Sequence, residues 1–305
     1  MNRAAAALIA AVSLALPTAV LTGVLSPVSL AARAQAQEQV LYVSAWDTGS
    51  HAPVSDLAAD QFVVREDGVR REILRVAPAT DPMAIAVVVD NSAEASDTIA
   101  NLRRALQAFL PEAAKLGPTA LVSVADRPTI LQDYTTSADA LVQASQRIFA
   151  PPGSGATLLD AIREVSQGLR RRPESRAAIV LVATERTEFT QLHHTQVLAA
   201  LEDGGASLHA LVLQSPGAGL GDTAARERAS VLDRGPKETG GVRIDVLSSM
   251  AYDDRLMDIA GILGHQYKVT YARPGSLIPP ETTEVSVTRA GVEARGTPAR
   301  EGARP

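Results

Sequence analysis

The chain contains no cysteine and has very few aromatic residues. Its 305 residues include a single tryptophan, and Phe, Trp and Tyr together make up only 3% of the sequence. Without cysteine there can be no disulfide framework, no thiolate nucleophile and no zinc site with cysteine ligands. Because large rings are scarce, the hydrophobic core must consist mainly of Val, Leu, Ile and Ala, which belong to the 46% of apolar residues.

Sequence motifs of the common enzyme classes are also missing. There is no Gly-x-Ser-x-Gly nucleophile motif, no phosphate-binding Gly-x4-Gly-Lys loop and no Gly-x-Gly-x-x-Gly motif after a strand. Asp90 follows an apolar run and could in principle accept a phosphoryl group, but Ser92 stands where a second aspartate is expected. The net charge of −5 offers no general attraction to nucleic acid. We therefore expect neither an enzyme nor a nucleic-acid-binding protein.

Residues 1–36 have the features of an export signal. Arg3 provides a positive start, residues 4–24 are apolar, and two small-x-small cleavage patterns end at Ala34 and Ala36. The apolar part is longer than the usual ~7–15 residues, so an uncleaved membrane anchor is the alternative. In both cases the folded part lies across a membrane from the cytoplasm. After cleavage we expect a periplasmic or extracellular protein without a membrane span.

The two ends of the remaining chain both predict short β-strands. Residues 38–80 contain alternating apolar patterns around a turn at Glu66-Asp67-Gly68, and residues 266–298 contain two further alternating segments. A small hairpin is only marginally stable by itself, so it needs partner strands. We expect the two ends to form one β-sandwich, followed by a disordered tail at residues 299–305.

The segment between these ends, residues 82–265, alternates buried strands with amphipathic helices. This alternation is typical of an α/β fold with a mostly parallel, Rossmann-like sheet and helices on both faces. Residues 214–241 are rich in Gly, Ala and Arg and interrupt the alternation. We expect a mobile loop there, with a short helical piece at residues 224–232.

Oxygen-bearing side chains occur in three loops, each of which follows a predicted strand or precedes a predicted helix. Residues 83–94 comprise a buried strand that ends in Asp90, Ser92 and Glu94; Thr157 lies in a glycine-rich loop before a helix, and Glu185 follows another apolar strand. In open α/β sheets, ligands bind beyond the carboxyl ends of the strands. Such oxygen atoms suit a hard cation such as Mg2+. The alternative is that Asp90 and Ser92 only cap the following helix.

This combination resembles the von Willebrand factor type A domain. That family's metal-ion-dependent adhesion site uses Asp-x-Ser-x-Ser, a Thr in a glycine-containing loop and an Asp after a later strand. Asp90 and Ser92 are similar to the first motif, Thr157 to the second, and Glu185 stands at the third position. The flanking segments resemble those of the secreted bacterial members of the family. The resemblance implies a von Willebrand A domain inserted into the β-sandwich.

Two substitutions distinguish the chain from the family's metal site. Glu94 replaces a serine and Glu185 replaces an aspartate, so the site is degenerate. Mg2+ requires near-octahedral ligands at about 2.1 Å, and a carboxylate in place of a serine crowds that shell. Without a cation, converging carboxylates repel each other by about 4 kcal/mol per pair at ~4 Å and an effective dielectric constant near 20. A divalent cation, Arg186 or a protonated carboxyl group must offset this repulsion.

Two further polar groups have simpler interpretations. His193 and His194 are adjacent, so on a helix they would point to different faces, and we expect both to be solvated rather than to bind one ion. Arg170, Arg171 and Arg172 end a predicted helix, where cations complement the helix dipole; a contact to acidic partners or lipid is the alternative.

Taken together, the residues and the resemblance imply an exported, non-enzymatic protein-binding module of adhesion type. Under this hypothesis Asp90, Ser92, Glu94, Thr157 and Glu185 bind Mg2+ or Mn2+, and a carboxylate of an unidentified partner protein completes the coordination. The alternative hypothesis is a structural module with a decayed metal site and no cofactor. Such a module would act through the sandwich or through residues 214–241. A hydrolase that uses Asp90 is the third hypothesis.

The first testable prediction concerns the N-terminal segment. If residues 1–36 act as a cleaved signal, the mature protein begins near Gln35 or Gln37. Mass spectrometry of the protein purified from its native envelope measures this directly. An intact Met1 on membrane-bound protein would show that the segment is an anchor.

Overall fold

The structure is a computed structural model that describes residues 36–185, 187–215, 223–275 and 278–300. These residues form two six-stranded sheets. Within the described ranges, no helix is both long enough and apolar enough to span a membrane.

The central part of the chain forms a mostly parallel sheet with the strand order β6-β5-β4-β7-β8-β9. Only β6, at one edge, is antiparallel to its neighbour. All eight residues of β4 are buried, as expected for a strand that is covered on both faces. The strands are β4 (Met83–Asp90), β5 (Thr119–Val124), β6 (Pro128–Thr135), β7 (Arg176–Thr184), β8 (Ser207–Leu213) and β9 (Arg243–Val246).

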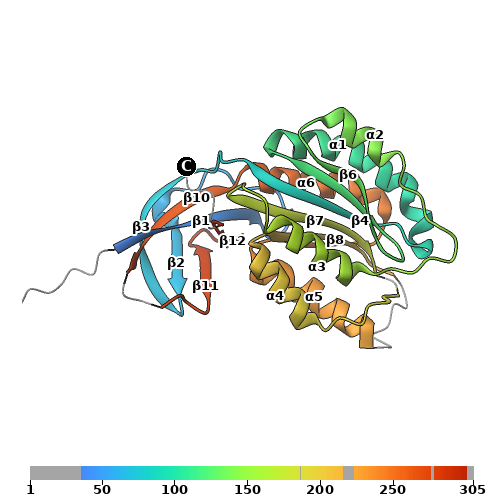
Figure 1. Cartoon of the computed structure of the whole chain (residues 1–305). Coiled ribbons are helices and arrows are strands. Elements are labelled where there is room, and N and C mark those ends of the chain that lie inside the picture. Colours follow the sequence, from blue (N-terminus) through green and yellow to red (C-terminus); the bar gives the residue numbers. More distant parts are fainter. Residues whose placement is uncertain (1–35, 186, 216–222, 276–277, 301–305) are drawn as a thin grey trace, which may run out of the picture. The chain divides into compact units, whose positions relative to one another are not determined.

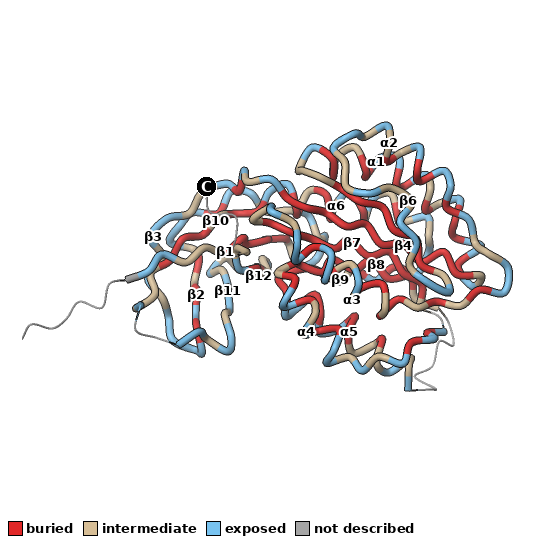
Figure 2. The backbone as a smooth tube through the Cα atoms, in the orientation of Figure 1, coloured by how far each residue is buried: buried red, intermediate tan, exposed pale blue. Residues whose placement is uncertain are grey.

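Helices cover both faces of this sheet (Figure 1). Alternate residues of β4 point to opposite sides: Ile85 and Val87 belong to one hydrophobic cluster, and Ala86 and Val88 to the other. The first face carries α1 (Ile99–Leu116), α2 (Ala138–Ser145) and α6 (Tyr252–Gly264), and the second carries α3 (Leu158–Leu169), α4 (His194–Gly204) and α5 (Thr223–Thr239). Figure 2 shows the buried strands between these two helical layers. The predicted α/β fold class is confirmed.

The second sheet combines strands from both ends of the chain. Its order is β11-β2-β3-β10-β1-β12, and all its pairings are antiparallel. Residues 38–80 and 266–298 therefore lie in one sheet. The strands are β1 (Ala36–Asp47), β2 (Phe62–Glu66), β3 (Val69–Pro78), β10 (Tyr267–Pro274), β11 (Thr283–Val287) and β12 (Val292–Pro298).

This second sheet folds over a small core of its own. The start of β3 pairs with β2 and the rest of β3 pairs with β10, so β3 belongs to two sets of strands. The Phe62 and Tyr267 rings meet edge to face with centroids 5.0 Å apart. The edge strands β11 and β12 also approach each other, because a Cβ atom on Gly296 would lie only 2.7 Å from Val285 Cγ2. The result is the sandwich-like element that was expected.

Arg176 fixes the points where the chain passes between the two sheets. It opens β7, is buried, and donates to the backbone carbonyls of Ala79 (2.9 Å), Asp81 (3.0 Å) and Leu263 (2.9 Å). Ala79 and Asp81 precede β4, and Leu263 precedes β10. Burial lowers the pKa of Arg176 to about 10, which still leaves the guanidinium charged at neutral pH. One side chain thus binds both crossing segments.

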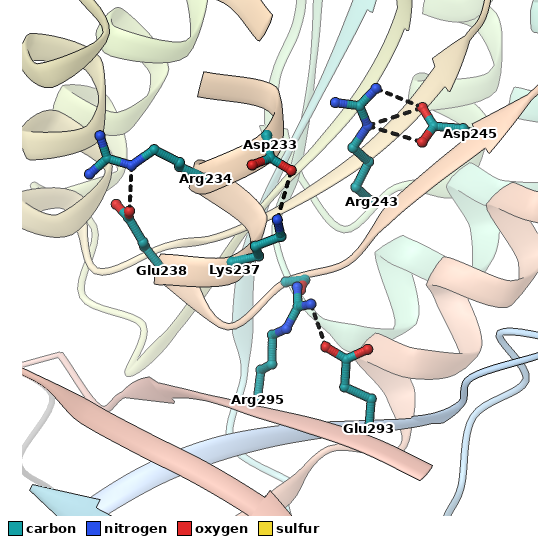
Figure 3. A network of polar contacts seen from close by, with 9 residues as sticks. Asp233, Arg234, Lys237, Glu238, Arg243, Asp245, Glu293 and Arg295 are labelled. Carbon is teal, nitrogen blue, oxygen red and sulfur yellow. Dashed lines mark hydrogen bonds and ion pairs between the residues drawn. The ribbon is translucent and has the colours of Figure 1, made fainter. Parts of the chain in front are cut away.

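Further contacts join the two sheets at α5 and β9. Figure 3 shows a network of ion pairs that includes Arg243 with Asp245 and Arg295 with Glu293. Arg295 also donates to the carbonyl of Gly241 (2.8 Å), and its guanidinium lies 5.3 Å from the centroid of the Trp46 ring. Trp46 comes from β1, yet it packs into the hydrophobic cluster of α1 and α6.

Two sequence-based expectations are wrong. Residues 214–241, expected to be a mobile loop, contain α5, which is 17 residues long. Gly235 lets this helix pack closely against β8, because a Cβ atom at that position would lie 2.8 Å from Leu208 Cδ2. Residues 216–222 of that segment lie outside the described residues. The tail is not free from residue 299, because Ala299 N donates to the Val40 carbonyl and Arg300 N to the Ser175 carbonyl. The rest of the tail, 301–305, and the proposed signal up to residue 35 are also outside the described ranges.

The second prediction tests the role of Arg176. Replacing Arg176 with Met removes three hydrogen bonds and leaves buried carbonyls without donors, which should lower the free energy of unfolding by roughly 3–5 kcal/mol. Urea denaturation measures this change. Arg170→Met is the control, because Arg170 is exposed and its loss should change stability by no more than about 0.5 kcal/mol. Equal effects of the two substitutions would contradict the role of Arg176.

Candidate functional site

The strand-end residues predicted from sequence lie at the carboxyl edge of the parallel sheet. Asp90 ends β4 and is buried. Its Oδ1 accepts from the Ser92 backbone (2.9 Å), and its Oδ2 accepts from the backbone (3.2 Å) and the hydroxyl (2.6 Å) of Thr184, at the end of the neighbouring strand β7. The structure therefore brings Asp90, Ser92 and Thr184 together. Both carboxylate oxygens of Asp90 already accept hydrogen bonds from the protein.

Thr157 lies in the loop before α3. This loop is hydrogen-bonded to Ala125, directly after β5. Its backbone N–H and its hydroxyl both lie 3.1 Å from the Ala125 carbonyl, to which they donate. In the same loop, Gly155 N donates to Asp126 Oδ1 (2.8 Å). The Thr157 hydroxyl hydrogen is thus directed toward the backbone, and its lone pairs remain for other contacts.

The two glutamates that distinguish this chain from the family have different surroundings. Glu94 is exposed and accepts hydrogen bonds from the backbone (3.0 Å) and the hydroxyl (3.2 Å) of Thr187. Glu185 is half-buried, and its backbone N–H donates to the Leu213 carbonyl. Asp90, Glu94 and Glu185 do not form a cluster of ligand atoms within 4.8 Å of one another; among the described residues only one such cluster occurs, and it lies elsewhere.

A buried arginine, Arg228, stands among these carboxylates. It comes from α5, is only 3% exposed, and donates through Nη2 to the carbonyl of Thr184. Burial lowers the pKa of Arg228, and the charges of Glu188, Asp90 and Glu185 oppose this effect. Sequence reasoning missed Arg228 because its segment was expected to be a loop. The arginine considered in its place, Arg186, is not among the described residues.

Glu188 is a second buried group that sequence reasoning missed. It is 2% exposed, and its Oε1 accepts a long hydrogen bond from Leu159 N (3.5 Å), whereas Oε2 has no hydrogen-bond partner among the described atoms. Burial raises the pKa of Glu188 to about 8, although the charge of Arg228 acts in the opposite direction. No motif in the sequence indicates this residue.

Large apolar side chains surround the same edge of the sheet and are exposed. Phe189 follows β7 and is 63% exposed, with its ring against Gly155. Phe149 is held near the end of β4, because its carbonyl accepts from Asn91 Nδ2 (2.6 Å). Leu247 and Met250 follow β9 and are also exposed. Four side chains from three separate loops thus present an apolar surface, which we call the apolar rim: Phe149, Phe189, Leu247 and Met250.

The expectation that His193 and His194 point to different faces is wrong. His193 precedes α4 and caps it, so only His194 belongs to the helix. The two imidazole centroids are 4.2 Å apart, and Glu227 of α5 contacts both rings. These three side chains form the one cluster of His, Asp or Glu ligand atoms found among the described residues.

Comparisons with known proteins find only low similarity. No protein-family model and no curated protein matches the chain. Similar solved structures include the PilB minor pilin from Streptococcus sanguinis, with 12% identity, a TM-score of 0.45, and coverage of 61% of this chain and 62% of the pilin. The vWF domain of the type V pili tip protein Mfa5 from Porphyromonas gingivalis has 12% identity, a TM-score of 0.42, and coverage of 59% and 96%.

A third similar structure is that of proximal thread matrix protein 1 from the mussel byssus with zinc occupying its metal-ion-dependent adhesion motif. It has 13% identity and a TM-score of 0.48, with coverage of 65% of this chain and 49% of that protein. The chain therefore spans less than two thirds of the length of the pilin and of the byssus protein. Similarities this low carry no conclusion about family or function. The structure itself shows the mostly parallel sheet with helices on both faces that the sequence resemblance implies.

The third prediction follows from the raised pKa of Glu188. Between its ordinary pKa of 4.5 and its folded pKa of about 8, the unfolded chain releases a proton that the folded chain keeps. This group therefore makes the free energy of unfolding fall as pH rises through that window, by at most about 1.4 kcal/mol per pH unit. Glu188→Gln should remove this contribution. Urea denaturation across the window measures it, and parallel pH profiles for the two proteins would contradict it.

Proposed function

We propose that the chain is an exported, non-enzymatic protein-binding module of von Willebrand A type that contacts its partner through the carboxyl edge of the parallel sheet. The apolar rim carries this proposal. Scattered exposed apolar side chains are ordinary, but aromatic and methionine side chains gathered around one edge are typical of an interaction surface. The loops that present them follow β7 and β9 or, for Phe149, follow α2 and are hydrogen-bonded to the end of β4, at the edge where ligands of open α/β sheets bind.

The loops that carry the rim are held in place by internal hydrogen bonds. Asn91 Nδ2 binds the Phe149 carbonyl, and Phe189 N donates to the Ala156 carbonyl (2.8 Å). Asn101 Nδ2 donates to Ser249 Oγ (2.8 Å), which connects α1 to the loop of Leu247 and Met250. A surface that is ordered before binding loses less conformational entropy on association, which favours its use for recognition.

We further propose that Arg228, rather than Mg2+ or Mn2+, neutralises the carboxylates at this edge. Buried oxygens are available for a cation, because Ser92 Oγ and Asn91 Oδ1 have no hydrogen-bond partner in the described structure. However, a divalent ion beside Asp90 would also lie near the guanidinium of Arg228 and would be repelled by it. Glu94 already accepts hydrogen bonds from the backbone and the hydroxyl of Thr187. The set Asp90, Ser92, Glu94, Thr157 and Glu185 therefore fits a resident divalent ion poorly.

The fourth prediction separates Arg228 from a metal ion. The melting temperature of the original chain should stay unchanged in millimolar Mg2+ or Mn2+. Arg228→Met should lower the free energy of unfolding by about 3–5 kcal/mol, because it leaves buried carboxylates without a cation. Either divalent ion should then restore part of that loss. Arg226→Met, on an exposed position of the same helix, is the control and should show neither effect.

The metal-dependent hypothesis predicts a different result for the same experiment. The original chain would gain stability as RT ln(1 + [L]/Kd), about 2.7 kcal/mol at a hundredfold excess of ion over Kd. Asp90→Ala would abolish this gain, and Glu94→Ser would increase it by restoring the family's ligand. That outcome would show that the site binds a divalent cation and would overturn the role given to Arg228.

The fifth prediction tests the binding surface. Phe189→Ser combined with Met250→Ser should abolish capture of a protein from the envelope fraction, because it removes apolar area from the rim without creating a buried cavity. Ile278→Ser is the matched control: Ile278 is apolar and even more exposed but lies between β10 and β11 of the other sheet. Captured proteins are identified by mass spectrometry, with and without chelator.

The pattern of loss distinguishes the two functional hypotheses. Specific loss with the double rim variant, independent of chelator, agrees with recognition at the carboxyl edge. Loss with Ile278→Ser alone would indicate a structural module that acts through the sandwich. Loss with chelator alone would indicate a cation-dependent adhesion site.

A further inference from the structure

We propose that His193, His194 and Glu227 form a surface site for Zn2+ or a chemically similar transition-metal ion. The site joins the N-terminus of α4 to the first turns of α5 and shares no residue with the apolar rim or with the strand-end carboxylates. It therefore goes beyond the proposed protein-binding function.

The ligand atoms are close enough to bind one ion. Their mutual distances are all within 4.8 Å. His193 Nε2 lies 3.7 Å from Glu227 Oε1, and His194 Nδ1 lies 2.7 Å from Glu227 Oε2. Two ligands that are each about 2.1 Å from a tetrahedral Zn2+ lie about 3.4 Å apart. Small side-chain adjustments therefore bring the three groups to coordination distances.

Neighbouring groups orient the ligands. His193 Nδ1 lies 2.8 Å from Thr195 Oγ1, which leaves Nε2 directed toward Glu227. In the metal-free chain His193 Nδ1 also accepts the capping hydrogen bond from Thr195 N (3.4 Å). When Nε2 binds a metal, the proton moves to Nδ1, which then donates to the Thr195 hydroxyl in place of that capping bond. The carboxylate of Glu227 is held by the His194 backbone N–H (2.6 Å), and this hydrogen bond is the main cause that lowers the pKa of Glu227. Glu227 is therefore ionised and ready to act as a ligand.

The ligand types select the class of metal. Two imidazole nitrogens and one carboxylate suit Zn2+, Co2+, Ni2+ or Cu2+, whereas Mg2+ and Ca2+ prefer oxygen ligands alone. The side chain of His193 is 56% exposed, and those of His194 and Glu227 are 22% and 15% exposed. An ion can thus enter from solvent, and water or an external ligand can complete its coordination.

Binding of zinc to the full chain without an affinity tag tests this proposal. Isothermal titration of metal-free protein with ZnCl2 should show one site, whereas MgCl2 should give no signal. Loss of a residue that only orients a ligand weakens metal affinity by about 10- to 100-fold. His194→Ala removes a ligand itself and should weaken the affinity by more than this. Thr195→Val should weaken it by about that amount. Affinity should also fall at acidic pH, because protons compete with the metal for its ligands.

The remaining variants keep the test independent of folding. His193→Asn removes the ligand nitrogen but retains a side chain that can cap α4, so its loss of zinc binding cannot be assigned to the cap. His265→Ala, which changes an exposed histidine outside the site, should bind zinc as the original chain does. The visible absorption spectrum of the Co2+ form should indicate nitrogen and oxygen ligands in the original chain and should be lost in His194→Ala. Zinc binding that persists in His194→Ala combined with Glu227→Gln, or no binding to the original chain, would overturn the proposal and leave an ion pair only.

Discussion

We propose that the carboxyl edge of the parallel sheet depends on one buried charge, the guanidinium of Arg228. Parallel strands bring the ends of β4 and β7 to one edge of the sheet, so Asp90 and Glu185 both lie at this edge. Like charges in a poorly solvated region repel each other strongly, so such an arrangement needs a cation. The interaction of Arg228 with Asp90, Glu185 and Glu188 meets this need from within the chain. The orientation of α5 and the arrangement of the edge loops are consequently linked.

The same use of buried arginine appears where the two sheets meet. Arg176 binds the carbonyls of both crossing segments, and Trp46 carries the hydrophobic contact from β1 into the cluster of α1 and α6. A chain without disulfides and with few aromatic rings must obtain such connections from charge-assisted hydrogen bonds and from aliphatic packing. These contacts explain how strands from opposite ends of the sequence and a large central segment form one compact unit, residues 35–305.

Two polar centres on the molecule differ in the chemistry that they can support. The strand-end site consists of oxygen atoms, a resident guanidinium and a surrounding apolar rim, which favours recognition of a protein surface. The cluster of His193, His194 and Glu227 contains nitrogen ligands, is accessible to solvent and has no resident cation among its described contacts. The first centre resembles a family site in position but differs in charge. The second contains none of the residues of the strand-end motif.

Much of the fold and part of the candidate site could be predicted from the sequence, because they depend on local patterns. The uninterrupted apolar run before Asp90 predicts a strand covered on both faces, and the alternating segments at the two chain ends predict the second sheet. The positions of Asp90, Ser92, Thr157 and Glu185 at strand or loop ends follow from the same patterns. Tertiary structure alone decided that Arg228 stands beside Asp90, that Glu188 is buried, and that His193 and His194 meet Glu227. Each of these contacts joins residues at least 29 positions apart through the packing of α3, α4 or α5 against the rest of the molecule, and no periodicity along the chain encodes such a distance.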